Sequence, residues 1–104
     1  MRQPAVFLIL ILFISCCAKK TANVSSGENL YKIHCQPCHP EGGNKINPAK
    51  TLSSKNLAEN NIKTADDIIR IMRRGAPGMF RFDEKFVSED EARKIAEYIF
   101  QAFR

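Results

Sequence analysis

The sequence Cys-Gln-Pro-Cys-His at residues 35–39 constrains the fold of this chain more than any other feature. The motif holds two of the four cysteines and one of the two histidines among 104 residues. Without its apolar N-terminal stretch the chain is short for a domain, and a core of that size buries only about 60–65% of its unfolded surface. Such small domains usually need a disulfide, a metal or a bound group. The use of this motif therefore decides how the chain folds.

Four uses of the motif can be compared. A disulfide between Cys35 and Cys38 would close a very short loop and leave His39 without a role. Thiol redox chemistry expects a preceding β-strand, but no alternating run of β-branched residues predicts one. Structural zinc needs four ligands from two separated pairs. A second pair is missing, because the other two cysteines, Cys16 and Cys17, lie beside the N-terminal apolar stretch. The remaining use is covalent attachment of haem, in which two thiols form thioethers and the adjacent histidine binds the iron.

A second iron ligand can be sought among the methionines. Met72 lies in a stretch with helical spacing, where a methionine usually packs in the core. Met79 lies in the loop sequence GAPGMF, whose glycines and proline let the backbone approach a flat ring. We expect Met79 to bind the iron; alternatively, it packs against the haem edge while water occupies that position. His34 is expected to be a surface residue, with a redox-linked titration as the alternative.

Residues 1–17 are predicted to be a signal peptide of the lipoprotein type. Arg2 precedes an apolar run at residues 5–14, which is shorter than the roughly 20 residues of a transmembrane helix. The following Ser-Cys pair resembles a bacterial lipoprotein signal, cleaved before Cys16, which is then lipidated. Two bystander cysteines or a vicinal disulfide are the alternatives. Residues 18–26 would form a flexible tether, so we expect an exported, lipid-anchored protein, facing the periplasm or on the outer membrane.

Helix caps and apolar spacing predict an all-α domain at residues 27–104. A short first helix leads from Gly27 into the cysteine motif, and a second short helix is expected around residues 54–59. A third begins at Thr64, which forms a capping-box pattern with Asp67. The last and longest begins at Ser88 and carries an apolar stripe on one face. Three to four helices would thus surround one haem at the centre.

The chain after residue 26 resembles the class I monohaem cytochromes c. The segments CHPEGGNKINPAKTL and GAPGMFRFDEKFVSEDEARKIAEYIF are similar to small photosynthetic-type and bacterial cytochromes c. They are also similar to outer-membrane monohaem lipoprotein cytochromes of metal-reducing bacteria. The resemblance implies the cytochrome c fold, with Cys35 and Cys38 as thioether donors. It implies that His39 and Met79 are the axial ligands of the iron.

Further roles follow from the resemblance alone. Pro48 would accept a hydrogen bond from the ring N–H of His39. Asn44 and Phe82 are placed among the haem-binding residues. The first and last helices would cross closely at Gly27, with two tyrosines, Tyr31 and Tyr98, in contact there. Two positions depart from the family pattern: Phe80 replaces a proline, and Ile71 replaces a glutamine of photosynthetic relatives.

A six-coordinate iron leaves no position for a small-molecule substrate, which indicates a one-electron carrier rather than an enzyme. The carrier would serve an extracytoplasmic electron-transport chain. One alternative is a haem peroxidase or sensor in which Met79 leaves the iron. Another is an electron-entry subunit of a larger redox complex.

The charge pattern bears on partners. Lys and Arg number sixteen against eleven Asp and Glu. Four arginines, Arg70, Arg73, Arg74 and Arg81, lie near Met79 in the sequence, which favours acidic redox partner proteins. The alternatives are a solvated rim or neutralisation of the haem propionates. No aromatic residues alternate with these arginines, so nucleic-acid binding is not expected. We expect a monomer attached to the membrane by its lipid.

Overall fold

The computed structural model describes residues 26–104, and the predicted signal peptide and Cys16 lie outside this range. The elements in order are α1 (Gly27–His34), the 3-10 turn η1 (Pro40–Gly42), α2 (Ser54–Glu59), α3 (Ala65–Arg74) and α4 (Glu89–Ala102). The described residues form no strand beyond one isolated bridge, which confirms the all-α prediction. None of these helices combines the length and apolar character needed to cross a membrane.

A hydroxyl side chain begins each α-helix by accepting a hydrogen bond from a backbone N–H of the first turn. The four capping residues are Ser26, Ser53, Thr64 and Ser88. Asp67 in α3 and Glu91 in α4 complete capping boxes by accepting in return from the cap residue's own N–H. Gly75 ends α3 with a φ of 75°, a value that favours glycine. The predicted helix starts are therefore confirmed.

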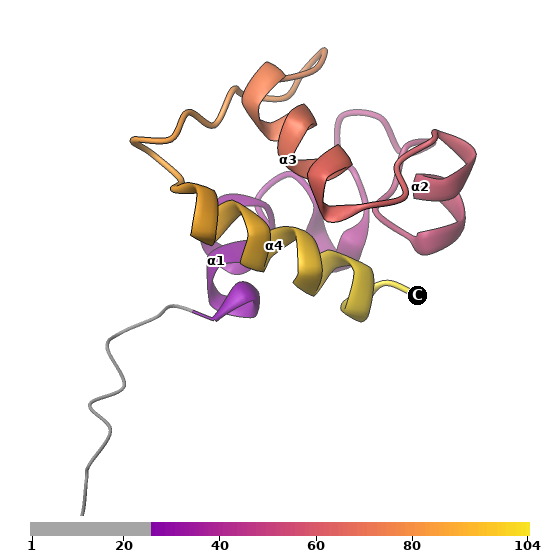
Figure 1. Cartoon of the computed structure of the whole chain (residues 1–104). Coiled ribbons are helices and arrows are strands. Elements are labelled where there is room, and N and C mark those ends of the chain that lie inside the picture. The colour runs from indigo at the N-terminus through magenta and orange to yellow at the C-terminus, as the bar shows by residue number, and fades with distance from the viewer. Residues whose placement is uncertain (1–25) are drawn as a thin grey trace, which may run out of the picture.

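Helix α4 packs across both α1 and α3 (Figure 1). Gly27 makes the crossing with α1 close, because a Cβ at that position would lie 2.3 Å from the carbonyl oxygen of Lys94. One turn farther along α1, the rings of Tyr31 and Tyr98 lie with centroids 5.3 Å apart. Both contacts agree with the roles that the family resemblance implied for these residues.

The core lies between α1, α3 and α4. Its buried side chains from α3 are Ile68, Ile69 and Met72, and those from α4 are Ala92, Ile95, Ala96 and Ile99. Near the end of the chain, Phe103 packs against Tyr31 at 5.3 Å and accepts a 2.8 Å hydrogen bond from the N–H of Ser54. The helices thus place the cysteine motif at the end of α1 and the Met79 loop directly after α3.

Candidate cofactor site

The cysteine motif forms a single tight turn after α1. The N–H of Cys35 donates to the carbonyl of Tyr31 at 2.8 Å, and the N–H of His39 donates to the carbonyl of Cys35 at 2.7 Å. Burial raises the pKa of the Cys35 thiol to about 12, with Cys38 adding to this shift. Neither thiol forms a disulfide within residues 26–104. Cys35 is therefore held as a neutral thiol, three residues before Cys38 in the same short turn.

The imidazole of His39 is oriented by a backbone carbonyl four residues later. Its Nδ1 lies 2.8 Å from the carbonyl oxygen of Gly43. The expectation that Pro48 would supply this carbonyl is wrong, because η1 reverses the chain through left-handed conformations at Glu41 and Gly42, with φ of 53° and 75°. Pro48 is exposed in the loop beyond. With Nδ1 occupied by Gly43, Nε2 remains available for a metal.

The hydroxyl of Tyr31 also holds this turn. It donates to the carbonyl of His39 and accepts from the N–H of Gly42 at 3.2 Å. Burial raises the pKa of Tyr31 to about 12, so the hydroxyl stays protonated at neutral pH. One side chain of α1 therefore satisfies two backbone groups of the turn that carries His39.

Met79 ends a β-turn that begins at Ala76. The N–H of Met79 donates to the carbonyl of Ala76 at 2.8 Å. Pro77 occupies the second position, and Gly78 occupies the third with a φ of 79°, the pattern of a type II turn. The methionine side chain thus leaves a short turn within the glycine- and proline-rich loop that the sequence indicated.

The ligand candidates from the two segments line the same space. Two cavities of about 310 and 380 Å³ adjoin each other between α1, α3 and the loops. The residues that line both are Cys35, His39, Asn44, Lys50, Ala76, Met79 and Phe82. Cys38 lines the second cavity, while Ile71 and Met72 line the first. The structure therefore brings together all the predicted site residues within its range except Pro48.

Asn44 and Phe82 shape the walls of these cavities. The side-chain oxygen of Asn44 accepts from the N–H of Ile46 and Asn47, and its amide donates to the carbonyl of Lys50. Asn44 therefore holds the loop between residues 44 and 50 in a fixed curve. Phe82 is buried and presents an aromatic ring to both cavities.

His34 is more than a surface residue. It is half-buried, and its ring packs edge-on against Phe86 with centroids 5.2 Å apart and against Phe82 at 6.2 Å. Phe82 and Phe86 are themselves stacked. His34 thus helps to build one aromatic side of the second cavity.

The donor set fits a c-type haem. Two thiols, an imidazole with one nitrogen already oriented and a thioether line one cavity system whose other walls are largely apolar. Bound there, haem would supply an iron that changes its charge by one electron. Gly43, whose carbonyl orients the ring of His39, is a contributor that sequence reasoning did not assign.

Comparisons with known proteins agree with this fit. The family described as cytochrome c oxidase, cbb3-type, subunit III matches residues 22–99. Cytochrome c6 of Cyanidium caldarium is 30% identical over 99 residues, which cover 88% of this chain and 89% of that relative.

Solved structures show the same relationship. OmcF, outer membrane cytochrome F from Geobacter sulfurreducens, superposes with a TM-score of 0.73 and 38% identity, over 76% of this chain and all of that one. Cytochrome c6C from Synechococcus sp. PCC 7002 superposes with a TM-score of 0.69 and 25% identity, over 74% of this chain and 93% of that one. The chain therefore belongs to this c6 and cbb3-type family of class I monohaem cytochromes c, electron carriers rather than catalysts, with one covalently attached c-type haem.

Proposed function

We propose that this protein carries single electrons in an extracytoplasmic electron-transport chain, with His39 and Met79 as the two axial ligands of its haem iron. The observation that carries the proposal is that both side chains line the same cavities as Cys35, although they come from segments forty residues apart. Cys35 and Cys38 would form the thioethers.

His39 is suited to stay on the iron in both oxidation states. The carbonyl of Gly43 fixes the orientation of its ring, and Tyr31 fixes its backbone. A hydrogen bond to Nδ1 also makes the other ring nitrogen a better donor. Little reorganisation of this side is therefore needed when an electron arrives or leaves.

Met79 supplies a soft, neutral sulfur from the other side. Its turn is fixed by Pro77 and Gly78, and the cavity wall behind it contains the apolar side chains of Ile71 and Met72. With two protein ligands the iron would have no open position, so electron transfer is the chemistry available to these residues.

The ligand assignment predicts the behaviour of a Met79→Ala variant. The wild-type ferric protein should show the weak far-red absorption band of a methionine sulfur bound to ferric iron, and the variant should lack it. External cyanide should bind the variant faster by on the order of tenfold or more, the effect of about 1.4 kcal/mol.

Met72→Leu is the matched control, because Met72 is buried in the same region and belongs to the core. That variant should keep the band and the slow cyanide binding. A wild-type ferric protein without the band, or a Met79→Ala variant that retains it, would refute Met79 as the ligand.

Partners would approach where the second cavity opens. Four exposed apolar side chains lie around it: Ile33, Ile46, Phe80 and Phe86. We propose that redox partner proteins dock there briefly, and that exposed arginines near the Met79 loop favour acidic partners. The protein itself would act as a monomer.

The location proposed for the protein is outside the cytoplasm. The signal peptide would be cleaved before Cys16, Cys16 would receive the lipid, and residues 18–26 would link the lipid to the domain. The similarity to OmcF, which is described as an outer membrane cytochrome, supports this proposal. The outer membrane is therefore the first place to look for the protein.

A further inference from the structure

The segment between α3 and α4 carries Met79 but has little regular structure to hold it. We call residues 75–88 the ligand loop. Beyond the turn at Met79, the N–H of Phe82 donates to the carbonyl of Met72 at 2.8 Å. Asp83 forms a local turn by accepting from the N–H groups of Lys85 and Phe86. Beyond Gly75, where the loop leaves α3, these contacts attach the loop to the α3 backbone through the N–H of Phe82.

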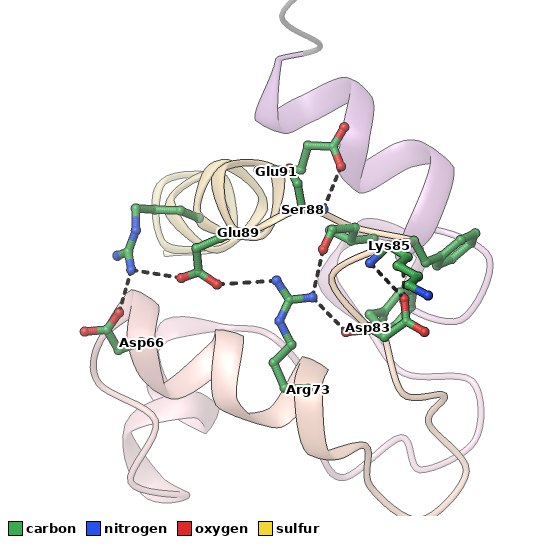
Figure 2. Close-up of polar contacts among 11 residues, drawn as sticks. Asp66, Arg73, Asp83, Lys85, Ser88, Glu89 and Glu91 are labelled. Atoms are coloured by element: carbon green, nitrogen blue, oxygen red, sulfur yellow. Dashed lines mark hydrogen bonds and ion pairs between the residues drawn. The ribbon is translucent and has the colours of Figure 1, made fainter.

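Arg73, in the last turn of α3, makes the main side-chain attachment. One terminal nitrogen of its guanidinium donates to two loop carbonyls, those of Phe82 and Val87, each at 2.8 Å. The other terminal nitrogen lies 3.4 Å from a carboxylate oxygen of Glu89, the first residue of α4. Figure 2 shows Arg73 reaching between the ribbon of the loop and the start of α4. One side chain thus joins α3, the ligand loop and α4.

Two other arginines of the cluster make fewer contacts. Arg70 is exposed and pairs with Asp67 on its own helix. Arg81, in the ligand loop, adds one contact with α3, since its Nε donates to the carbonyl of Arg73 at 3.2 Å. The Arg73 side chain is only 22% exposed, and its Nε is buried without a hydrogen-bond partner in the described part of the chain. Its guanidinium is therefore placed by the loop carbonyls rather than by solvent or by a single ion pair.

The two carbonyls that Arg73 holds lie three and eight residues after Met79. A neutral thioether is a weak ligand, and it leaves the iron whenever the loop that carries it opens locally. Each contact that holds the loop closed lowers the population of that open state. Hydrogen bonds from a charged donor to buried carbonyls are among the stronger contacts available for this task.

We propose that Arg73 is a positioning residue for the sixth iron ligand: it keeps Met79 on the iron by holding the ligand loop closed against α3 and α4. This proposal rests on the His39 and Met79 ligation proposed above. Arg73 acts through the loop backbone and does not touch the iron. A positive charge alone would not be sufficient for this role, because the planar guanidinium of Arg73 contacts the two loop carbonyls and Glu89 at the same time.

The test uses the full-length holoprotein in its ferric form and measures the rate at which external imidazole displaces methionine. Arg73→Gln should speed displacement by on the order of tenfold, equivalent to about 1.4 kcal/mol. It should also weaken the far-red methionine band. Arg73→Lys, which keeps the charge but loses the fork, should lie between wild type and Arg73→Gln and serves if the latter does not fold.

Arg70→Gln is the matched control, because it removes a charge from the same helix but only an exposed pair. It should change the displacement rate by less than about twofold. Global unfolding in denaturant, followed by the helical signal, separates local loop opening from general destabilisation. The displacement rate should change far more than the population of globally unfolded protein can account for.

The outcomes are distinguishable. A wild-type protein without the methionine band removes the ligation proposal and with it the role of Arg73. A wild-type protein with the band, together with Arg73 variants whose displacement rates equal that of wild type, removes only the role of Arg73. Equal acceleration by Arg70→Gln would show a charge effect and would also overturn the proposal.

Discussion

Tyr31 is the residue on which the histidine side of the site most depends. Its hydroxyl is a donor to His39 and an acceptor for Gly42, and its ring lies among the rings of Tyr98 and Phe103. The side chain is 1% exposed, so water cannot replace its hydrogen bonds. A single hydroxyl thus connects α1 and the aromatic packing of α4 to the backbone that presents the imidazole.

Removing that hydroxyl should cost stability without changing the shape of the core. Tyr31→Phe leaves a partly buried carbonyl and a buried N–H without their partner, so we expect a loss of about 1–3 kcal/mol in the free energy of unfolding. Denaturant titration of the holoprotein at neutral pH measures it. Tyr98→Phe is the control, because the Tyr98 hydroxyl forms no hydrogen bond with another residue in 26–104. Equal losses in both variants would contradict this role for Tyr31.

At the scale of single residues, sequence predicted the chemistry better than the hydrogen bonds. Cys35, Cys38 and His39 were recognisable as candidates because haem attachment requires these residue types at this spacing, and Met79 because it lies in a loop rich in glycine and proline. The partner of His39 was not, because a backbone carbonyl carries no sequence signal. Which carbonyl reaches the ring depends on the left-handed residues of η1, and this brings Gly43 rather than Pro48 to Nδ1.

At the scale of elements, α3 has the most strongly determined beginning. The carboxylate of Asp67 accepts from the backbone N–H groups of Lys63 and Thr64 at 2.9 and 3.0 Å. These hydrogen bonds lower the pKa of Asp67 from 3.8 to about 2, and the bond from the N–H of Lys63 has the largest effect. The charged form is thus favoured by folding, and the beginning of α3 is linked to pH.

This link predicts how stability changes in acid. Because the pKa is lower in the folded state, the contribution of Asp67 is fully present above about pH 4 and is lost as the pH falls towards about 2. Asp67→Asn should be less stable than wild type at neutral pH, and the difference should shrink across that window. Denaturant titrations at several pH values measure the difference.

Asp90→Asn is the control for the acid titration, because Asp90 is exposed and pairs only with Lys94 one turn later. Its difference from wild type should change less between pH 4 and 2. If the stability gap between wild type and Asp67→Asn stayed constant over that range, the capping carboxylate would not be the linked group.

Helices were more predictable than the segments between them. Caps and apolar spacing act over a few residues, so the start of α3 at Thr64 and of α4 at Ser88 could be predicted from sequence. The ligand loop could not, because its shape depends on Arg73, which lies outside it in sequence. A guanidinium that binds carbonyls leaves no pattern in the sequence.

At the scale of the whole molecule, the positive charge near Met79 is less available than the sequence indicated. Arg70 pairs with Asp67, and Arg73 is used by the ligand loop and Glu89. Arg74 and Arg81 are exposed, like Arg70, but form no ion pair within residues 26–104. Charge could be counted from sequence, but its pairing depends on how α3 meets α4. An acidic partner would therefore meet two arginines here rather than four.

The proposed anchor makes a prediction for the intact protein. Cells that export it should yield a membrane-associated protein. Its mass should include one haem and, on Cys16, a diacylglyceryl group and an acyl group. Cys16→Ser should remove the lipid mass and release the protein from membranes, because the anchor is then absent. Fractionation and mass spectrometry of the purified protein measure both effects.

Cys17→Ser is the control and should keep both the lipid mass and the membrane location. A wild-type protein with haem but no lipid mass would show that the cysteine pair is not a lipidation site. Haem attachment at Cys35 and Cys38 would be unaffected by that result, so the two proposals fail separately.

The position of Ser26 has a consequence for encounters with other proteins. The eight residues of α1 place about 12 Å between Ser26 and the cysteine motif, at 1.5 Å for each residue. The shallow depression beside Ser26, formed with Lys94, Glu97 and Tyr98, shares no residue with the cavities around Met79. If Cys16 is lipidated as proposed, the link to the membrane would enter the domain at Ser26, separate from the cavities around Met79. Successive redox partners could then reach those cavities while the protein stays attached to the membrane.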